Sequence, residues 1–123
     1  ANKELKSIDI IRCWIVRQFQ NEYNPVHLHS GHISGVGYLK VPKSFGNVSE
    51  KKKINDKGRL TFIHGSVNLF SKATYVIKPE VGDFYLFPNY LLHTVYPFSD
   101  TDEERRSISF NAQLDKNSAN YAS

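Results

Sequence analysis

The sequence predicts an all-β protein of one domain, built as a sandwich or a barrel. Its 123 residues suffice for one domain with a core of its own. Hydrophobic residues make up 40% of the chain and aromatic residues 13%, which is typical of a folded globular protein. Short segments rich in β-branched and aromatic residues recur at near-regular spacing between turn residues, and this pattern indicates many short strands.

The clearest predicted strands span residues 8–19, 33–41, 60–63, 74–78, 83–87 and 105–114. The first is too apolar to be exposed on both faces, so we expect Cys13 to be packed in the interior. The strand at 33–41 carries Gly35 and Gly37 on one side, and glycine within a strand marks a place where a ligand or another backbone approaches closely.

The middle of the chain contains a polar excursion followed by three short strands. Residues 42–57 are charged and rich in turn residues, and we expect a mobile surface loop that could act as a lid. Gly58 precedes the strand at 60–63, and a turn separates the strand at 74–78 from the one at 83–87, which Pro88 ends.

The last strand has one polar face. Alternation along residues 105–114 places Arg105, Ser107 and Ser109 on one side and Arg106 on the other. A guanidinium beside hydroxyl groups suits the binding of a buried carboxylate, whereas a half-exposed edge strand would show the same pattern. We expect the small polar tail at 115–123 to be frayed.

Charge and cysteine content exclude several classes of protein. The net charge is +4, and the basic run at 51–53 has no interleaved aromatic residue, which favours a solvated loop over a nucleic-acid site. No apolar run has the length of a membrane helix and no basic-then-apolar signal segment opens the chain, so we expect no membrane partner. Cys13 is the single cysteine, which excludes an internal disulfide and suits a reducing cytosol.

Three histidines form a candidate metal site. His27 and His29 lie one residue apart on an extended segment, so their side chains point to the same side. His93, 64 positions after His29 at the end of an apolar run, can complete a triad. We interpret His32 and His64 as structural or surface residues, although His32 could replace His29 if the loop turns back. Among all-β folds, the jelly roll commonly holds metals in its mouth.

Four segments together resemble the iron(II)/2-oxoglutarate-dependent oxygenases. They are residues 24–29 (NPVHLH), 34–39 (SGVGYL), 82–93 (GDFYLFPNYLLH) and 105–111 (RRSISFN). The order and spacing of these segments, which extend over residues 21–114, are similar to those of small members of the prolyl-hydroxylase-like branch found in bacteria and marine phages. The resemblance implies a double-stranded β-helix, the jelly roll of this superfamily.

The resemblance also implies roles for individual residues. His27 matches the first metal ligand and His93 the last, whereas His29 stands where most of the superfamily has an aspartate or glutamate. Arg105 and Ser107 match the pair that holds the distal carboxylate of 2-oxoglutarate.

Tyr38 matches a tyrosine that often lines the same pocket. The implied activity is that of a dioxygenase that uses Fe(II), 2-oxoglutarate and O₂ to hydroxylate an unidentified substrate, with a peptidyl side chain as one candidate. The implied location is the cytosol of a bacterium or of a phage-infected host.

Two other functions are compatible with the residues. A cupin with a three-histidine site that uses no 2-oxoglutarate is favoured by His27, His29 and the spacing of Gly82, Pro88 and His93. No glutamate follows His29 at short range, which argues against it. The second alternative is a non-catalytic jelly-roll module, for binding or for structure, in which the histidines only pack.

Overall fold

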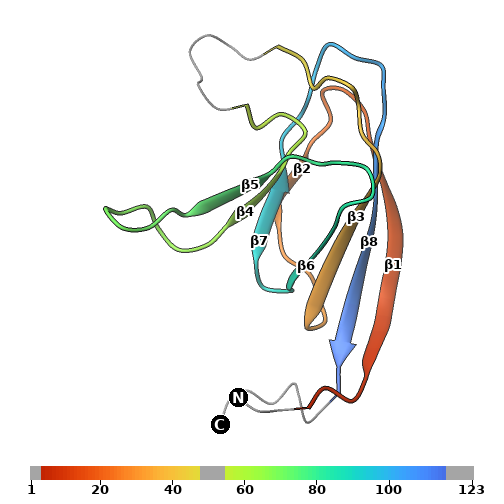
Figure 1. The fold of residues 1–123 in the computed structure, drawn as a ribbon, viewed down its shortest axis with the longest axis vertical. Coiled ribbons are helices and arrows are strands. Elements are labelled where there is room, and N and C mark those ends of the chain that lie inside the picture. The colour runs from red at the N-terminus through yellow and green to blue at the C-terminus, as the bar shows by residue number, and fades with distance from the viewer. Residues whose placement is uncertain (1–3, 48–54, 116–123) are drawn as a thin grey trace.

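The computed structural model describes residues 4–47 and 55–115, and in these parts of the chain it contains eight strands and no helix (Figure 1). The strands are β1 (Ile8–Gln18), β2 (Asn24–His27), β3 (Ile33–Lys40), β4 (Leu60–Ile63), β5 (Thr74–Ile77), β6 (Phe84–Pro88), β7 (Leu92–Val95) and β8 (Arg105–Leu114). No described segment is therefore a helix that could cross a membrane. Residues 48–54 of the predicted surface loop and residues 116–123 of the predicted tail lie outside the described residues.

The strands form two four-stranded antiparallel sheets. One sheet has the order β1-β8-β3-β6 and the other the order β2-β7-β4-β5, so the first and last strands are hydrogen-bonded neighbours. Two sheets whose neighbouring strands are distant in sequence make an eight-stranded jelly roll. The predicted all-β jelly-roll fold is thus confirmed. β8 lies between β1 and β3, so its polar face is not that of an edge strand.

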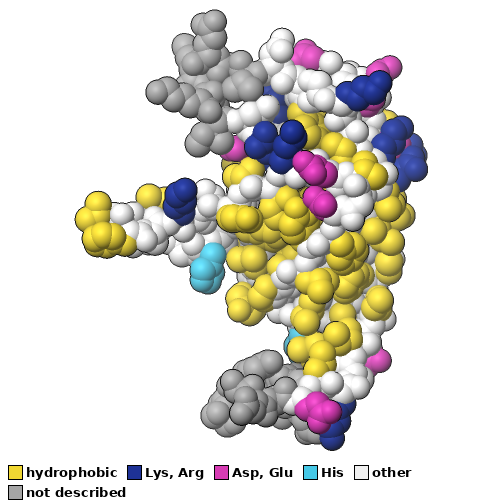
Figure 2. All heavy atoms as spheres, viewed as in Figure 1, with side chains coloured by type: hydrophobic (Ala, Val, Ile, Leu, Met, Phe, Trp, Pro, Cys, Tyr) yellow, Lys and Arg dark blue, Asp and Glu magenta, His cyan; other side chains and the backbone are white. Residues whose placement is uncertain are grey.

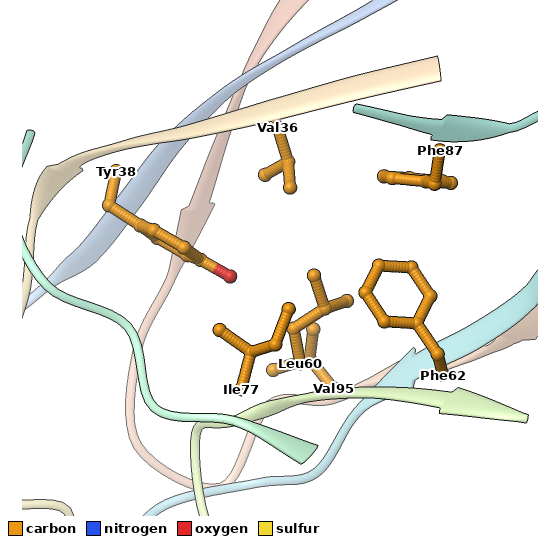
Figure 3. Close-up of a cluster of buried hydrophobic side chains, with 7 residues drawn as sticks. All are labelled: Val36, Tyr38, Leu60, Phe62, Ile77, Phe87 and Val95. Carbon is orange, nitrogen blue, oxygen red and sulfur yellow. The ribbon is translucent and has the colours of Figure 1, made fainter. Parts of the chain in front are cut away.

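The hydrophobic core fills the space between the sheets (Figure 3). Because side chains alternate along a strand, every second residue of each strand reaches this space. The buried members are Val36, Tyr38 and Phe87 from one sheet, and Leu60, Phe62, Ile77 and Val95 from the other. Their burial stabilises the sandwich and provides the rigid support on which the candidate site is built.

The outward face of β1 is apolar and exposed, which corrects one prediction. Cys13 is exposed rather than packed, and its neighbour Ile15 is 49% exposed. Trp14 and Val16, by contrast, line internal cavities of the sandwich. Figure 2 shows hydrophobic side chains gathered over the sheet that contains β1. The alternation along β1 is present, but the sequence does not reveal whether anything covers the outward face.

Gly35 and Gly37 make room for aromatic side chains. A Cβ atom on Gly35 would lie 2.5 Å from the Phe110 ring, and one on Gly37 would lie 2.5 Å from the Phe84 ring. Phe84 and Phe110 stack on each other with their centroids 5.8 Å apart. The close approach predicted at these glycines is therefore made by side chains of the neighbouring strands.

Candidate metal centre

Three histidines meet at the end of the sandwich where β2 pairs with β7. His27 of β2 lies opposite His93 of β7 in the antiparallel register, and their ring centroids are 4.2 Å apart. His29 lies 4.9 Å from each of the other two rings. One candidate ligand atom from each residue lies within 4.8 Å of the others, so the three side chains could share one metal ion. The sequence did not identify β7 as a strand, although it selected His93.

Backbone carbonyls orient two of the imidazoles. The Nδ1 atom of His27 lies 2.6 Å from the carbonyl oxygen of Pro25, and that of His93 lies 2.9 Å from the carbonyl oxygen of Leu91. When Nδ1–H donates to a carbonyl, Nε2 is left with its lone pair available for a metal. The Nε2 atoms of His29 and His93 are 2.9 Å apart. Two nitrogens that each lie about 2.1 Å from an ion at a right angle are about 3 Å apart, so this spacing fits coordination.

His29 reaches the cluster by a route that the sequence did not predict. β2 ends at His27, so His29 lies just beyond the strand, although its ring still lies beside that of His27. Its backbone is held by Asn89 instead. The N–H of His29 donates to the Asn89 carbonyl at 3.1 Å, and the Asn89 amide donates to the His29 carbonyl at 3.1 Å. This reciprocal pair of bonds fixes the loop and turns the ring of His29 toward the other two.

Burial keeps two of the imidazoles neutral. Burial lowers the pKa of His93 to about 4, and it also lowers the pKa of His29, with a further contribution from the charge of His27. The rings of Phe87 and Phe62 lie 5.0 and 6.0 Å from that of His93 and provide the apolar surroundings. A neutral imidazole is the form that binds a metal, so these surroundings favour metal binding at neutral pH.

A buried arginine opens into the same cavity as the histidines. Arg105, Ser107 and the three histidines line one internal cavity of about 50 Å³. Arg105 is 2% exposed, and its Nε donates to the carbonyl oxygen of Gly58 at 3.0 Å. Burial lowers the pKa of Arg105, which reflects the cost of keeping a cation away from water.

Arg105 has no acidic partner within the described parts of the chain. The ion pairs there join Arg17 and Arg106 to Glu104. Arg106 points to the opposite side of β8, where its Nε and a terminal nitrogen donate to the Glu104 carboxylate at 2.8 and 2.7 Å. The two adjacent arginines thus differ: Arg106 is paired with the Glu104 carboxylate, whereas Arg105 is buried beside an internal cavity.

Tyr38 and Ser107 lie next to Arg105. They are partners across the β3–β8 pairing and are 2% and 3% exposed. The Arg105 guanidinium carbon lies 5.2 Å from the centre of the Tyr38 ring. The Tyr38 hydroxyl points into the interior (Figure 3) and makes no well-formed hydrogen bond with the described residues, although the Arg105 guanidinium lies close enough to affect its pKa. Burial raises the pKa of this phenol, so the hydroxyl keeps its proton and is available as a donor.

A second and much larger cavity adjoins two of the histidines. This open cleft of about 540 Å³ is lined by both His27 and His29 and by Arg12, Trp14 and Tyr23, among others. Sequence reasoning missed Arg12 and Trp14, although their period-two spacing on a predicted strand could have placed them on one face with Val16.

The other two histidines lie outside the cluster. The Nδ1 atom of His32 accepts a hydrogen bond from the backbone N–H of Leu114 at 2.9 Å, and His64 is exposed beyond the end of β4. In residues 4–47 and 55–115, the one group of three potential metal ligands is that of His27, His29 and His93. In this arrangement His29, and not His32, lies beside His27 and His93.

The chain is similar to known proteins in both sequence and fold. Residues 12–111 match the family model "Putative 2OG-Fe(II) oxygenase". No curated protein matches.

Two solved structures have a similar fold. One is an oxidoreductase of the 2OG-Fe(II) oxygenase family from Burkholderia pseudomallei, with a TM-score of 0.62 and 17% identity over 91% of this chain and 47% of that chain. The other is a Pseudomonas putida prolyl-4-hydroxylase, with a TM-score of 0.57 and 18% identity over 91% of this chain and 55% of that chain. The chain spans about half the length of either protein.

The family match and the site concern the same part of the chain. The matched region contains all eight strands in whole or in part, the three histidines and the buried arginine. The likeness to the two solved structures supports the same jelly roll. The chain belongs to the family of 2OG-Fe(II) oxygenases.

Proposed function

We propose that the chain is an Fe(II)- and 2-oxoglutarate-dependent dioxygenase that hydroxylates its substrate. The observation that carries the proposal is the buried Arg105, which has no acidic partner among the described residues and opens into the same cavity as the three histidines. A buried cation is costly unless it is paired, so this position suits the arrival of an anionic ligand. We assign His27, His29 and His93 as the metal ligands and Arg105, Ser107 and Tyr38 as the residues that bind the co-substrate.

The donor set fits a divalent transition metal. Three imidazole nitrogens on one side leave the remaining positions of an octahedral ion open, as in the facial triads of non-haem iron oxygenases. His29 replaces the usual carboxylate, so the ligands contribute no negative charge. The two negative charges of 2-oxoglutarate would then offset two of the three positive charges that the divalent metal and Arg105 bring together.

The inner cavity joins the two groups that a metal-bound dicarboxylate would need, the histidines at one end and Arg105 at the other. One end of 2-oxoglutarate would lie at the histidines, and its distal carboxylate would accept hydrogen bonds from the Arg105 guanidinium. The Ser107 hydroxyl lines the cavity and can supply a further donor. The Tyr38 hydroxyl lies outside its lining but beside Arg105, where it can support the same carboxylate. Leu60 and Val95 line the same cavity and limit the access of water to it.

The chemistry and the protein have separate tasks. Iron with its co-substrate activates O₂ for the hydroxylation of a C–H bond, while the chain binds the reactants and holds them in position. As the substrate we carry over a peptidyl side chain, by analogy with the prolyl-4-hydroxylase that shares the fold. We place the activity in the cytosol of a bacterium or of a phage-infected host.

A second candidate function is a three-histidine metal protein that does not use 2-oxoglutarate. The absence of a carboxylate among His27, His29 and His93 favours it. A non-catalytic jelly-roll module remains the third alternative, and it differs from both others because it predicts no stoichiometric metal.

Binding of 2-oxoglutarate to the metal-loaded protein separates these functions. We expect anaerobic titration to produce heat in calorimetry and, with Fe(II), a visible charge-transfer band. Arg105→Ala should weaken binding by at least about tenfold, because a charge-assisted contact in a partly desolvated pocket is worth roughly 2–5 kcal/mol.

The matched control is Arg106→Ala, since Arg106 lies on the same strand but points away from the cavity. Its effect on 2-oxoglutarate binding should be small. If the metal-loaded parent shows neither heat nor a band at millimolar 2-oxoglutarate, the three-histidine metal protein replaces the oxygenase. If no metal is bound, the non-catalytic module replaces both.

A further inference from the structure

We propose that the open cleft outside the histidines binds the carboxylate of the primary substrate through Arg12, which is stacked on Trp14. This inference rests on the proposed oxygenase function and adds a substrate class to it. The substrate would carry a carboxylate near the C–H bond that is hydroxylated, either in a small acid or in an acidic residue of a peptide.

Two compartments of very different size meet at the histidines. The inner cavity, about 50 Å³ in volume, extends from the histidines to Arg105, and the outer cleft is about 540 Å³ and open to solvent. His27, His29 and Trp14 line both compartments. If the inner cavity takes the co-substrate, a further reactant can approach the metal from the outer cleft, whose chemistry then determines which substrate is accepted.

Arg12 is held over the wall of that cleft. Its guanidinium carbon lies 5.0 Å from the centre of the Trp14 ring, and the Trp14 ring lies 5.6 Å from that of His29. Two successive contacts thus connect the guanidinium to the candidate metal ligands. Stacking on an indole restricts the motion of the arginine side chain while its hydrogen-bond donors stay free.

Arg12 is also the cation of the cleft that has no ion-pair partner within the described residues. Arg17 is paired with Glu104 at 2.6 Å, and Glu22 accepts a hydrogen bond from the backbone N–H of Phe19 at 2.9 Å. The ion pairs of the described residues do not include Arg12. A guanidinium that keeps its donors free binds a carboxylate in a bidentate manner.

The aromatic lining defines the rest of the substrate. Trp14 offers its ring to an apolar or planar group beside the carboxylate, and Tyr23 is 65% exposed in the same cleft. The size and the open mouth of the cleft admit either a free acid or a segment of a peptide.

Trp14 makes the proposal directly testable, because it is the single tryptophan of the chain. Its fluorescence reports on occupancy of the cleft. The protein would be loaded with Ni(II) and saturated with 2-oxoglutarate, and then titrated with N-acetyl amino acids as free acids and as the corresponding amides, tryptophan excluded. A second arm would use end-blocked peptides that contain glutamate or glutamine at one position. This arm distinguishes an acidic peptide residue from a free acid.

We expect at least one acid, or the glutamate peptide, to bind at least about fivefold more tightly than its neutral counterpart, as for a partly exposed charge pair of about 1 kcal/mol. Arg12→Gln should remove this preference, and Arg12→Lys should retain part of it. Lys40→Gln, which removes an exposed positive charge elsewhere, should leave the preference intact. Thermal melting of each variant would verify that it is folded.

Two outcomes would overturn the proposal. One is that the parent prefers no acid over its amide, and the other is that the preference survives in Arg12→Gln. Calorimetry of 2-oxoglutarate on the same samples tests the proposed function separately, because Arg12 lies outside the inner cavity. Should 2-oxoglutarate fail to bind while the Arg12-dependent preference persists, the oxygenase function fails and the carboxylate site stands.

Discussion

The buried guanidinium of Arg105 should reduce the stability of the ligand-free protein, and Arg105→Met tests this. The side chain is 2% exposed, has no acidic partner in the described residues, and its pKa is lowered by burial. A buried charge without a partner lowers the free energy of unfolding, and a bound anion would offset this loss. Methionine keeps most of the length of the side chain and removes the charge.

The expected change is a modest gain in stability. Replacing buried charged groups by apolar ones of similar volume often stabilises a protein by about 1–4 kcal/mol. Against this stand the bond from Arg105 to the Gly58 carbonyl and the contact with the Tyr38 ring, together worth roughly 1–3 kcal/mol. We therefore expect the free energy of unfolding of Arg105→Met to rise by about 1 kcal/mol, which corresponds to a Tm roughly 3–8 °C higher.

Chemical denaturation with and without ligand provides the assay. Saturating 2-oxoglutarate at 100 times its Kd should stabilise the metal-loaded parent by about 2.7 kcal/mol and the variant much less, so the order of stability should reverse. Arg106→Met is the control and should destabilise the protein, because it takes a partner from Glu104. If ligand-free Arg105→Met were less stable than the parent by more than about 1 kcal/mol, Arg105 would be a structural residue and the reasoning would be refuted.

Three further predictions concern the histidines and the ion pair on the outer face. His27→Ala or His93→Ala should abolish stoichiometric metal content, measured by elemental analysis, whereas the exposed His64→Ala should not change it. His29→Asp should keep the metal and restore the usual triad, while His29→Ala should weaken binding in a metal titration; equal affinity in the two variants would remove His29 from the ligand set. Hydrogen bonds from Arg106 and Arg17 lower the pKa of Glu104 to about 2 from 4.5, so the contribution of this carboxylate to stability should be complete above pH 4.5 and be lost as the pH falls toward 2. The unfolding free energies of the parent and of Glu104→Gln should therefore converge over that pH range. A difference that stays constant with pH would contradict the assignment.

The sequence by itself determined the fold class and several elements. The predicted strands at 60–63 and 105–114 coincide with β4 and β8, because period-two alternation and flanking turn residues act locally. The same alternation correctly placed Arg105 and Ser107 on the inner face and Arg106 on the outer face. Such features depend on neighbours within a few residues, which a sequence shows directly.

Only the tertiary structure decided which groups meet and which remain unpaired. His29 joins the cluster through Asn89, 60 positions away. Arg105 has no carboxylate partner among the described residues, because the nearby Glu104 faces the other side of the sheet. Cys13 is exposed because no described segment covers the outward face of β1. Pairing between distant strands and the covering of a sheet face are non-local properties, so a local sequence pattern cannot specify them. The cavity that contains Arg105 and the three histidines forms only when the two sheets pack on each other.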